Sequence, residues 1–349
     1  MAPQSAEDVK VLNNLIASTL ALVKQFRPSI STASTTPAID NPPNPLRVLR
    51  DSASLLKAHT TKVSLLAINK PFTPSAITKV LRDLTSTCLP AMMSAVQICT
   101  QEKASYSTLV EKEVQARVSR VFREMENLLN ELQSIANGGS APARRDSLSS
   151  TGVVWESCDA LIELEKMGLA GLAVKKAEQY RDAVKDAIEE LQEWKEGEDL
   201  DNEGVDELLD GDDEGIDGDA DLMEDIFNAA NSLPKDRPEL KELVEQAEGK
   251  LKKIVLLFNA LIRRRLKPFE DGEKGKVKAL DAVVEMLRSV QKDVDDLANC
   301  FYELNEEDVK VALETCVGHA KEACKIAKLK DGKEDEFTTW SQKWEEAIG

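Results

Sequence analysis

The 349-residue sequence has few of the residues from which common active sites are built. It contains only two histidines, His59 and His319, and 4% aromatic residues. It also lacks an HExxH metal motif, a GxxxxGK[ST] phosphate loop and a GxSxG nucleophile turn. His319 lies in the helical segment CVGHAKEAC, where a core or half-buried histidine is expected rather than a zinc ligand. We therefore expect a protein that is not an enzyme and uses no cofactor or small-molecule substrate.

Long hydrophobic runs and paired cysteines are absent as well. No apolar run approaches the roughly 20 residues that span a bilayer, and the start MAPQSAEDVK lacks the pattern of a signal peptide. We therefore expect a soluble intracellular protein without a membrane span. The cysteines form no CxxC pair, and their apolar helical context predicts buried, reduced thiols rather than disulfides. They are Cys88, Cys99, Cys158, Cys300, Cys316 and Cys324.

Apolar residues recur at spacings of three and four along most of the chain, which predicts helices almost everywhere. The first predicted helix, from Val9 to Phe26, stops at RPSISTASTTPAIDNPPNP, and the second covers about residues 46–69. Thr73 is predicted to cap a third helix, which should kink or break at Pro90. The fourth has a strict heptad spacing. Its apolar positions are Val114, Val118, Val121, Met125, Leu128, Leu132 and Ile135.

The remaining pattern predicts two bundles of helices. A helix over VVWESCDALIELEKMG and a longer one from Leu169 to Trp194 complete the first part of the chain. Helices resume from Leu222 to Asn231, after Pro238 and after GEKGK, and the last carries Phe337, Trp340 and Trp344. The predicted fold is all-α, with antiparallel helical bundles over residues 1–197 and 222–349. An acidic, flexible linker over residues 198–221 is predicted to join them.

The negative charge is concentrated in that linker. Residues 198–221 contain thirteen carboxylates and no lysine or arginine, so the rest of the chain carries only five of the eighteen excess negative charges. Asp210, Asp212, Glu214 and Gly215 match the first half of an EF-hand calcium loop. The second half fails, because Asp217 stands where an apolar residue is needed and Asp221 replaces the bidentate glutamate. We interpret the segment as a solvated tether without a specific metal site.

The same segment is also a candidate for protein binding. Its carboxylates could attract a basic partner or fold back on a basic part of the same chain. The candidate interaction residues are Asp210, Asp212, Asp213, Glu214, Asp217, Asp219 and Asp221.

A basic amphipathic stretch, LKKIVLLFNALIRRRLKPF, covers residues 251–269. Its RRRLK sequence is a candidate partner-binding or nuclear-import site, which we call the basic cluster. The alternative is a core helix whose cations gather at its C-terminal end, where the helix dipole favours them. Nucleic-acid binding is not expected from one small basic stretch in an acidic chain. The basic cluster consists of Arg263, Arg264, Arg265 and Lys267.

Ser147 lies in a sequence that suits a basophilic kinase. Arg144 and Arg145 precede it by three and two residues, and the apolar Leu148 follows it. A phosphate at Ser147 would add about −1.5 to −2 charge beside the arginines and just before the VVWES helix. Ser147 is therefore a candidate phosphorylation site.

The segment from Val153 to Trp194 resembles the cyclin-D-binding protein family, also described as Grap-and-cyclin-D-interacting or maternal Id-like proteins. The matching features are Val154, Trp155, Cys158 and Asp159, an Ala-rich helix ending near Glu189, and the acidic run with a second helical region beyond it. The resemblance implies an all-helical protein of the cytoplasm and nucleus. It also implies binding to cyclin-like, cell-cycle or transcription regulators, and restraint of their activity. Trp155 itself is expected to anchor the core.

A different class of protein also uses bundles of long helices. Vinculin- and catenin-like scaffolds of the cytoskeleton have this architecture, so such a scaffold is the alternative function. Actin binding would separate the two.

Overall fold

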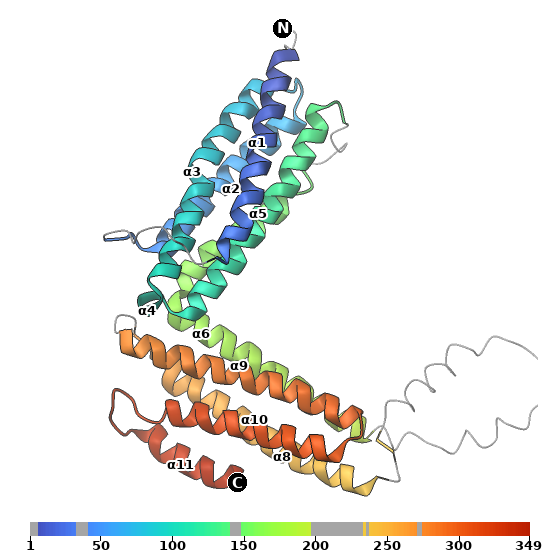
Figure 1. Ribbon diagram of the computed structural model, residues 1–349, viewed down its shortest axis with the longest axis vertical. Coiled ribbons are helices and arrows are strands. Elements are labelled where there is room, and N and C mark those ends of the chain that lie inside the picture. Colours follow the sequence, from blue (N-terminus) through green and yellow to red (C-terminus); the bar gives the residue numbers. More distant parts are fainter. Residues whose placement is uncertain (1–5, 33–40, 140–147, 197–232, 235–236, 271–273) are drawn as a thin grey trace, which may run out of the picture. The chain divides into compact units, whose positions relative to one another are not determined.

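The computed structural model describes residues 6–32, 41–139, 148–196, 233–234, 237–270 and 274–349, and these residues are almost entirely helical (Figure 1). The prediction of an all-α fold with two bundles is confirmed. Among the described residues no β-strand forms, and Lys330 and Lys333 make one isolated antiparallel bridge. The acidic residues 198–221 and the predicted helix from Leu222 to Asn231 lie outside the described residues.

The first compact unit comprises the chain up to Leu172 together with residues 271–278. Its long helices lie side by side in Figure 1, with α2 packed on α3 and α1 packed on both α3 and α5. Ion pairs attach α6 to the bundle, from Lys57 to Asp159 at 2.6 Å and from Arg120 to Glu156 at 2.8 Å. The elements are α1 (Ala6–Ile30), α2 (Pro45–Ile68), α3 (Pro74–Gln101), α4 (Lys103–Tyr106), α5 (Thr108–Ala136) and the first part of α6 (Thr151–Glu196).

The heptad pattern describes the core of this unit well. All of its members from Val114 to Leu132 are buried, and Ile135 is half-buried. Beyond the pattern, Phe122 is fully buried and stacks on Phe26 with ring centroids 5.9 Å apart.

Pro28 and Pro90 lie inside helices of the first unit. Helix α1 continues through Pro28 and ends at Ile30, inside the stretch RPSISTASTTPAIDNPPNP where it was predicted to stop. Helix α3 continues through Pro90 to Gln101, so the helix does not break there. A proline inside a helix removes one hydrogen bond, and its ring crowds the carbonyl of the preceding turn, at a cost of about 3 kcal/mol. Burial on both sides of it, as at Leu89 and Met92, holds the adjoining turns in place.

Polar side chains define where helices begin. Thr73 is the N-cap residue of α3 as predicted, but its hydroxyl donates to the Pro71 carbonyl instead of capping the helix. Ser107, in contrast, accepts a hydrogen bond from the amide of Val110 and starts α5. Ser107 and the short helix α4 before it were not predicted.

The second compact unit comprises Ala173 to Glu270 and Ala279 to Gly349. Trp194, near the end of α6, packs on Phe301 and Tyr302 at centroid distances of 6.1 and 5.8 Å. Helix α8 contacts both α10 and α11. The further elements are α8 (Pro238–Leu261), the π-helix η1 (Ile262–Leu266), α9 (Lys274–Tyr302), α10 (Glu306–Ile326) and α11 (Glu336–Ile348).

The two compact units divide inside α6, between Leu172 and Ala173. Residues 173–196 therefore belong to the second unit. The reason is that the apolar side chains at the end of α6, Trp194 among them, pack on α9.

Gly168 interrupts α6 where the sequence predicted two separate helices. Its φ of 62° and ψ of −169° are non-helical and lie in a region that is essentially restricted to glycine. We expect Gly168→Ala to lower the free energy of unfolding by about 2 kcal/mol, because an alanine there stores backbone strain. Urea unfolding followed by circular dichroism measures this effect.

Gly152→Ala is the matched control in the same helix. A Cβ atom at Gly152 would meet no atom within 4 Å, and alanine is the better helix former, so no loss of stability and a gain of up to about 1 kcal/mol are expected. Equal effects of the two variants would contradict the role of Gly168.

Candidate interaction surface

The π-helix η1 carries the basic cluster, and it directs the four cations to different environments. Lys267 donates its amide to the Ile262 carbonyl at 3.0 Å, the i to i+5 bond of a π-helix. The wider turn leaves Ile262 and Leu266 buried while Arg263 and Arg264 are exposed. Nothing in the sequence IRRRL predicted this turn.

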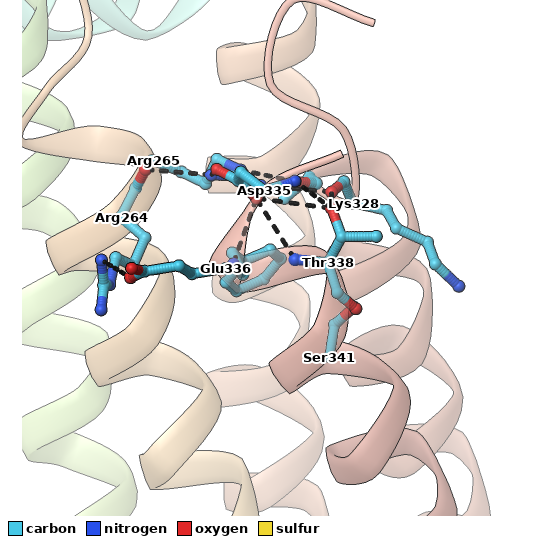
Figure 2. A network of polar contacts seen from close by, with 9 residues as sticks. Arg264, Arg265, Lys328, Asp335, Glu336, Thr338 and Ser341 are labelled. Carbon is cyan, nitrogen blue, oxygen red and sulfur yellow. Dashed lines mark hydrogen bonds and ion pairs between the residues drawn. The ribbon is translucent and has the colours of Figure 1, made fainter. Parts of the chain in front are cut away.

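Arg265 points inward and joins three elements of the second unit (Figure 2). Its guanidinium binds both carboxylate oxygens of Asp335, at 2.8 and 2.9 Å. It also donates to the main-chain carbonyls of Ala327 and Lys328, at 2.6 and 3.2 Å, beyond the end of α10. The same group lies 4.4 Å from the centre of the Phe337 ring. With only 10% of its side chain exposed, Arg265 serves the fold and is not available to a partner.

Asp335 starts α11 as its N-cap residue. Its carboxylate accepts hydrogen bonds from the amides of Phe337 and Thr338, while the Thr338 hydroxyl accepts one from the Asp335 amide. The hydrogen bonds from Arg265 are the main reason why the pKa of Asp335 falls to about 2. The pair therefore fixes the start of α11 against η1.

The other three cations of the basic cluster face solvent. Arg264 pairs with the exposed Glu336 at 2.6 Å, and Lys267 lies 3.9 Å from Glu178. Arg263 is exposed, and it forms no ion pair or hydrogen bond with the described residues. The predicted cluster is thus divided, and Arg263, Arg264 and Lys267 remain as the candidate partner-binding residues.

Further basic residues, the exposed Lys252 and the half-buried Lys253, continue this surface along α8. Lys252 bonds to the buried Glu248 at 3.2 Å, and Lys253 donates to the Ala347 carbonyl at 2.6 Å. Between these lysines and Arg263 lies Leu256, whose exposure of 57% is high for an apolar side chain. The basic residues of this helix therefore surround an exposed leucine. The sequence had indicated only the basic part of this arrangement.

The other predicted site residues are outside this surface. Ser147, Arg144, Arg145 and the acidic residues 210–221 lie beyond the described parts of the chain, so the structure does not test them. Leu148 is described, and it is buried. Its amide donates to the Ser64 hydroxyl at 2.8 Å.

The histidines and cysteines do not form a site together. His319 is half-buried and lies 2.6 Å from a carboxylate oxygen of Asp293. His59 has a lowered pKa because it is partly buried and lies near Lys62. Within the described ranges no group of three or more His, Cys, Asp or Glu residues could hold a metal ion.

Five of the six cysteines are buried as predicted, and Cys300 is half-buried. Burial raises the pKa of Cys99, Cys158, Cys316 and Cys324 to about 12. Trp155, expected in the core, is half-buried, and its indole nitrogen has no hydrogen-bond partner among the described residues. No helix in the described part of the chain is long and apolar enough to cross a bilayer.

Comparisons with known proteins identify the family. Residues 48–197 match the family described as Grap2 and cyclin-D-interacting, N-terminal, and residues 208–325 match its C-terminal counterpart. An uncharacterized protein of Schizosaccharomyces pombe is 27% identical over 305 residues, which are 86% of this chain and 83% of that protein. An uncharacterized protein of Saccharomyces cerevisiae is 22% identical over 310 residues, or 86% and 84% of the two chains. The two family matches cover more than half of the sequence, so the chain belongs to the Grap2 and cyclin-D-interacting family.

Proposed function

We propose that the protein binds other proteins and thereby restrains cell-cycle progression or transcription, without catalysing a reaction. The match to both parts of a cyclin-D-interacting family is the observation that carries this proposal. It makes a D-type cyclin the first partner to test. Action in both the cytoplasm and the nucleus is part of the proposal, because cyclin-like and transcriptional partners work there.

The exposed cations of the second unit support a protein-binding role. Arg263, Arg264 and Lys267 present positive charge on a chain whose formal net charge is −18. A local positive surface on an acidic protein selects partners with complementary acidic surfaces and disfavours nucleic acid, which the rest of the chain would repel.

A binding assay with purified proteins tests the proposal directly. The full chain is immobilised and exposed to a D-type cyclin at about physiological ionic strength, with an A-type cyclin as the matched control. We expect saturable binding of the D-type cyclin at about micromolar concentration or below, and clearly weaker binding of the control. No binding of the D-type cyclin, or equal binding of both, would reject a D-type cyclin as the specific partner.

The scaffold alternative requires a separate measurement. The first unit contains helices of 24 to 29 residues packed side by side, as the bundles of vinculin- and catenin-like scaffolds do. Co-sedimentation of the full chain with filamentous actin distinguishes the two functions. Saturable co-sedimentation together with failure to bind the cyclin would favour the scaffold.

A further inference from the structure

One face of α8 in the second unit is exposed between the contacts that this helix makes with α6 and α11. On one side of this face, α6 contacts α8 through Arg181 and Asn259 at 3.1 Å and through Gln192 and Glu248 at 3.0 Å. On the other side, α11 contacts it where the Trp344 indole donates to the Lys253 carbonyl at 2.8 Å. Between α6 and α11, α8 exposes Lys252 and Leu256, and the adjoining η1 exposes Arg263; we call these three residues the α8 face.

The α8 face has more positive charge than its neighbours neutralise. Lys252 shares the carboxylate of Glu248 with Lys195, and Arg264 at the edge of the face pairs with Glu336. Lys253 and Arg263 have no carboxylate partner among the described residues. Negatively charged groups are therefore the complementary ligands for both ends of the face.

The middle of the α8 face is apolar. Leu256 is 57% exposed and follows Lys252 by one helical turn. On α11, which borders the face, the half-buried Trp340 packs between Phe337 and Trp344, at ring-centroid distances of 5.6 and 6.4 Å. An apolar side chain of a partner could cover Leu256 and remove it from water, which favours a partner that is amphipathic as well as acidic.

The geometry of a helix surface also limits the backbone of the partner. The main-chain amides and carbonyls inside α8 are used by the helix itself, so a strand would find no edge with which to pair. A helical partner satisfies its own main-chain groups. Lys252 and Arg263 are eleven residues apart, which corresponds to about 16 Å along the axis, so a partner helix of about three turns reaches both.

We propose that the α8 face binds an acidic amphipathic helix of a partner protein. An apolar residue of that helix covers Leu256, and its carboxylates face Lys252 and Lys253 at one end and Arg263 and Arg264 at the other. This inference rests on the proposed protein-binding function and names its surface and the chemistry of the partner. The chain's own acidic segment fits less well, because Gly204, Gly211, Gly215 and Gly218 interrupt it and disfavour a helix.

The probe for this surface is a fluorescent helical peptide of about 20 residues, with glutamates flanking a row of leucines at helical spacing, and a scrambled peptide as its control. Fluorescence anisotropy measures the binding of each to the full chain. We expect Leu256→Glu and Arg263→Glu each to weaken binding of the helical peptide about tenfold. Raising the salt concentration from about 0.05 to about 0.3 M should weaken it further for the unmodified chain.

Matched control variants lie elsewhere in the same unit. Val311 on α10 is 62% exposed, and Arg288 on α9 is an exposed arginine, so Val311→Glu and Arg288→Glu introduce the same changes away from the α8 face. Both should alter affinity less than about twofold. The proposal is overturned if the control variants weaken binding as much as the α8 variants do, or if the scrambled peptide binds equally well.

Other occupants of the face give different results, and each would overturn the proposal. If the chain's own acidic segment occupies it, changing Asp210, Asp212 and Asp213 to asparagine will tighten peptide binding about fivefold or more. If a second copy occupies it, the unmodified chain will be a dimer by light scattering and the Leu256→Glu chain a monomer. If a membrane occupies it, phosphatidylserine vesicles will bind the unmodified chain and not the Leu256→Glu chain.

The cyclin assay on the same variants keeps the two proposals distinguishable. Equal cyclin binding by the unmodified chain, Leu256→Glu and Val311→Glu, with no peptide binding, would overturn the α8 surface and leave the proposed function in place. Peptide binding that depends on Leu256, without any cyclin binding, would support the surface and reject the cyclin as partner.

Discussion

Replacing Arg265 with methionine is expected to lower the free energy of unfolding of the second unit by about 3 kcal/mol. The change leaves the partly exposed Asp335 carboxylate and two main-chain carbonyls without their charged donor, and it removes the packing of an Arg265 side chain that is only 10% exposed. Urea unfolding followed by tryptophan fluorescence suits this test. Three of the four tryptophans, Trp194, Trp340 and Trp344, belong to the second unit.

Arg264→Met is the control for Arg265→Met. The neighbouring arginine pairs with Glu336, but both side chains of that pair are exposed, so the expected loss is less than about 0.5 kcal/mol. If the two variants lose the same stability, the inward position of Arg265 is not what holds α11.

The dependence of stability on pH gives a second measure of the same contact. The folded pKa of Asp335 is about 2, below its ordinary value of about 3.9 in an unfolded chain. Its contribution to stability is therefore complete above about pH 4 and is lost as the pH falls through about 2. For this partly exposed carboxylate we expect about 1 to 2 kcal/mol. Asp335→Asn should flatten the change in stability between about pH 4 and pH 2, compared with the unmodified chain.

The spacing of apolar residues was sufficient to predict most of the fold. The heptad from Val114 to Leu132 is buried, and the boundary predicted at Gly168 is the non-helical residue of α6. These features were predictable because burial repeats along a helix and because glycine tolerates backbone angles that other residues avoid. At Pro90 the sequence left a kink and a break open, and the helix does not break there, because tertiary packing outweighs the local cost of the proline.

The candidate surface was only partly predictable. The sequence placed Arg263, Arg264, Arg265 and Lys267 in one cluster, whereas the π-helix turns Arg265 toward Asp335, seventy residues away in the sequence. A contact between residues so far apart in the sequence produces no local sequence pattern from which it could be predicted. The exposure of Leu256 could not be predicted either, because a leucine within an apolar helix is expected to be buried. Whether such a leucine is exposed depends on where the neighbouring helices pack.

The second large loss of stability is expected from a substitution at Leu148, which directly follows the candidate phosphorylation site Ser147. Leu148→Ala should lower the free energy of unfolding of the first unit by about 3 kcal/mol, because the side chain is 1% exposed and its removal leaves a cavity. Leu65→Ala is the control. Leu65 is exposed and lies beside Ser64 on α2, so its truncation should cost less than about 0.5 kcal/mol. Hydrogen exchange of peptides from α2 and α5 reports on this unit.

The residues after Leu148 hold the segment that follows Ser147 in place; we call the buried Leu148 and these contacts the anchor. Ser149 and Ser150 each donate an amide and a hydroxyl hydrogen bond to the carboxylate of Glu131, at distances from 2.5 to 3.0 Å. Burial alone would raise the pKa of Glu131, but these four hydrogen bonds lower it. The ionised carboxylate of Glu131 therefore holds Ser149 and Ser150 in place. A kinase that recognises Ser147 together with the apolar Leu148 can bind only after local unfolding has released Leu148 from the core.

Glu131→Gln should weaken the anchor without changing the sequence from Arg144 to Leu148 that the kinase reads. We therefore expect a basophilic kinase to phosphorylate Ser147 in the Glu131→Gln chain about fivefold faster than in the unmodified chain, because the open state becomes more populated. Glu126→Gln on the same helix, where Glu126 pairs with Arg27, is the matched control and should leave the rate unchanged. Equal rates in all three chains would show that the anchor at Leu148 does not control access to Ser147.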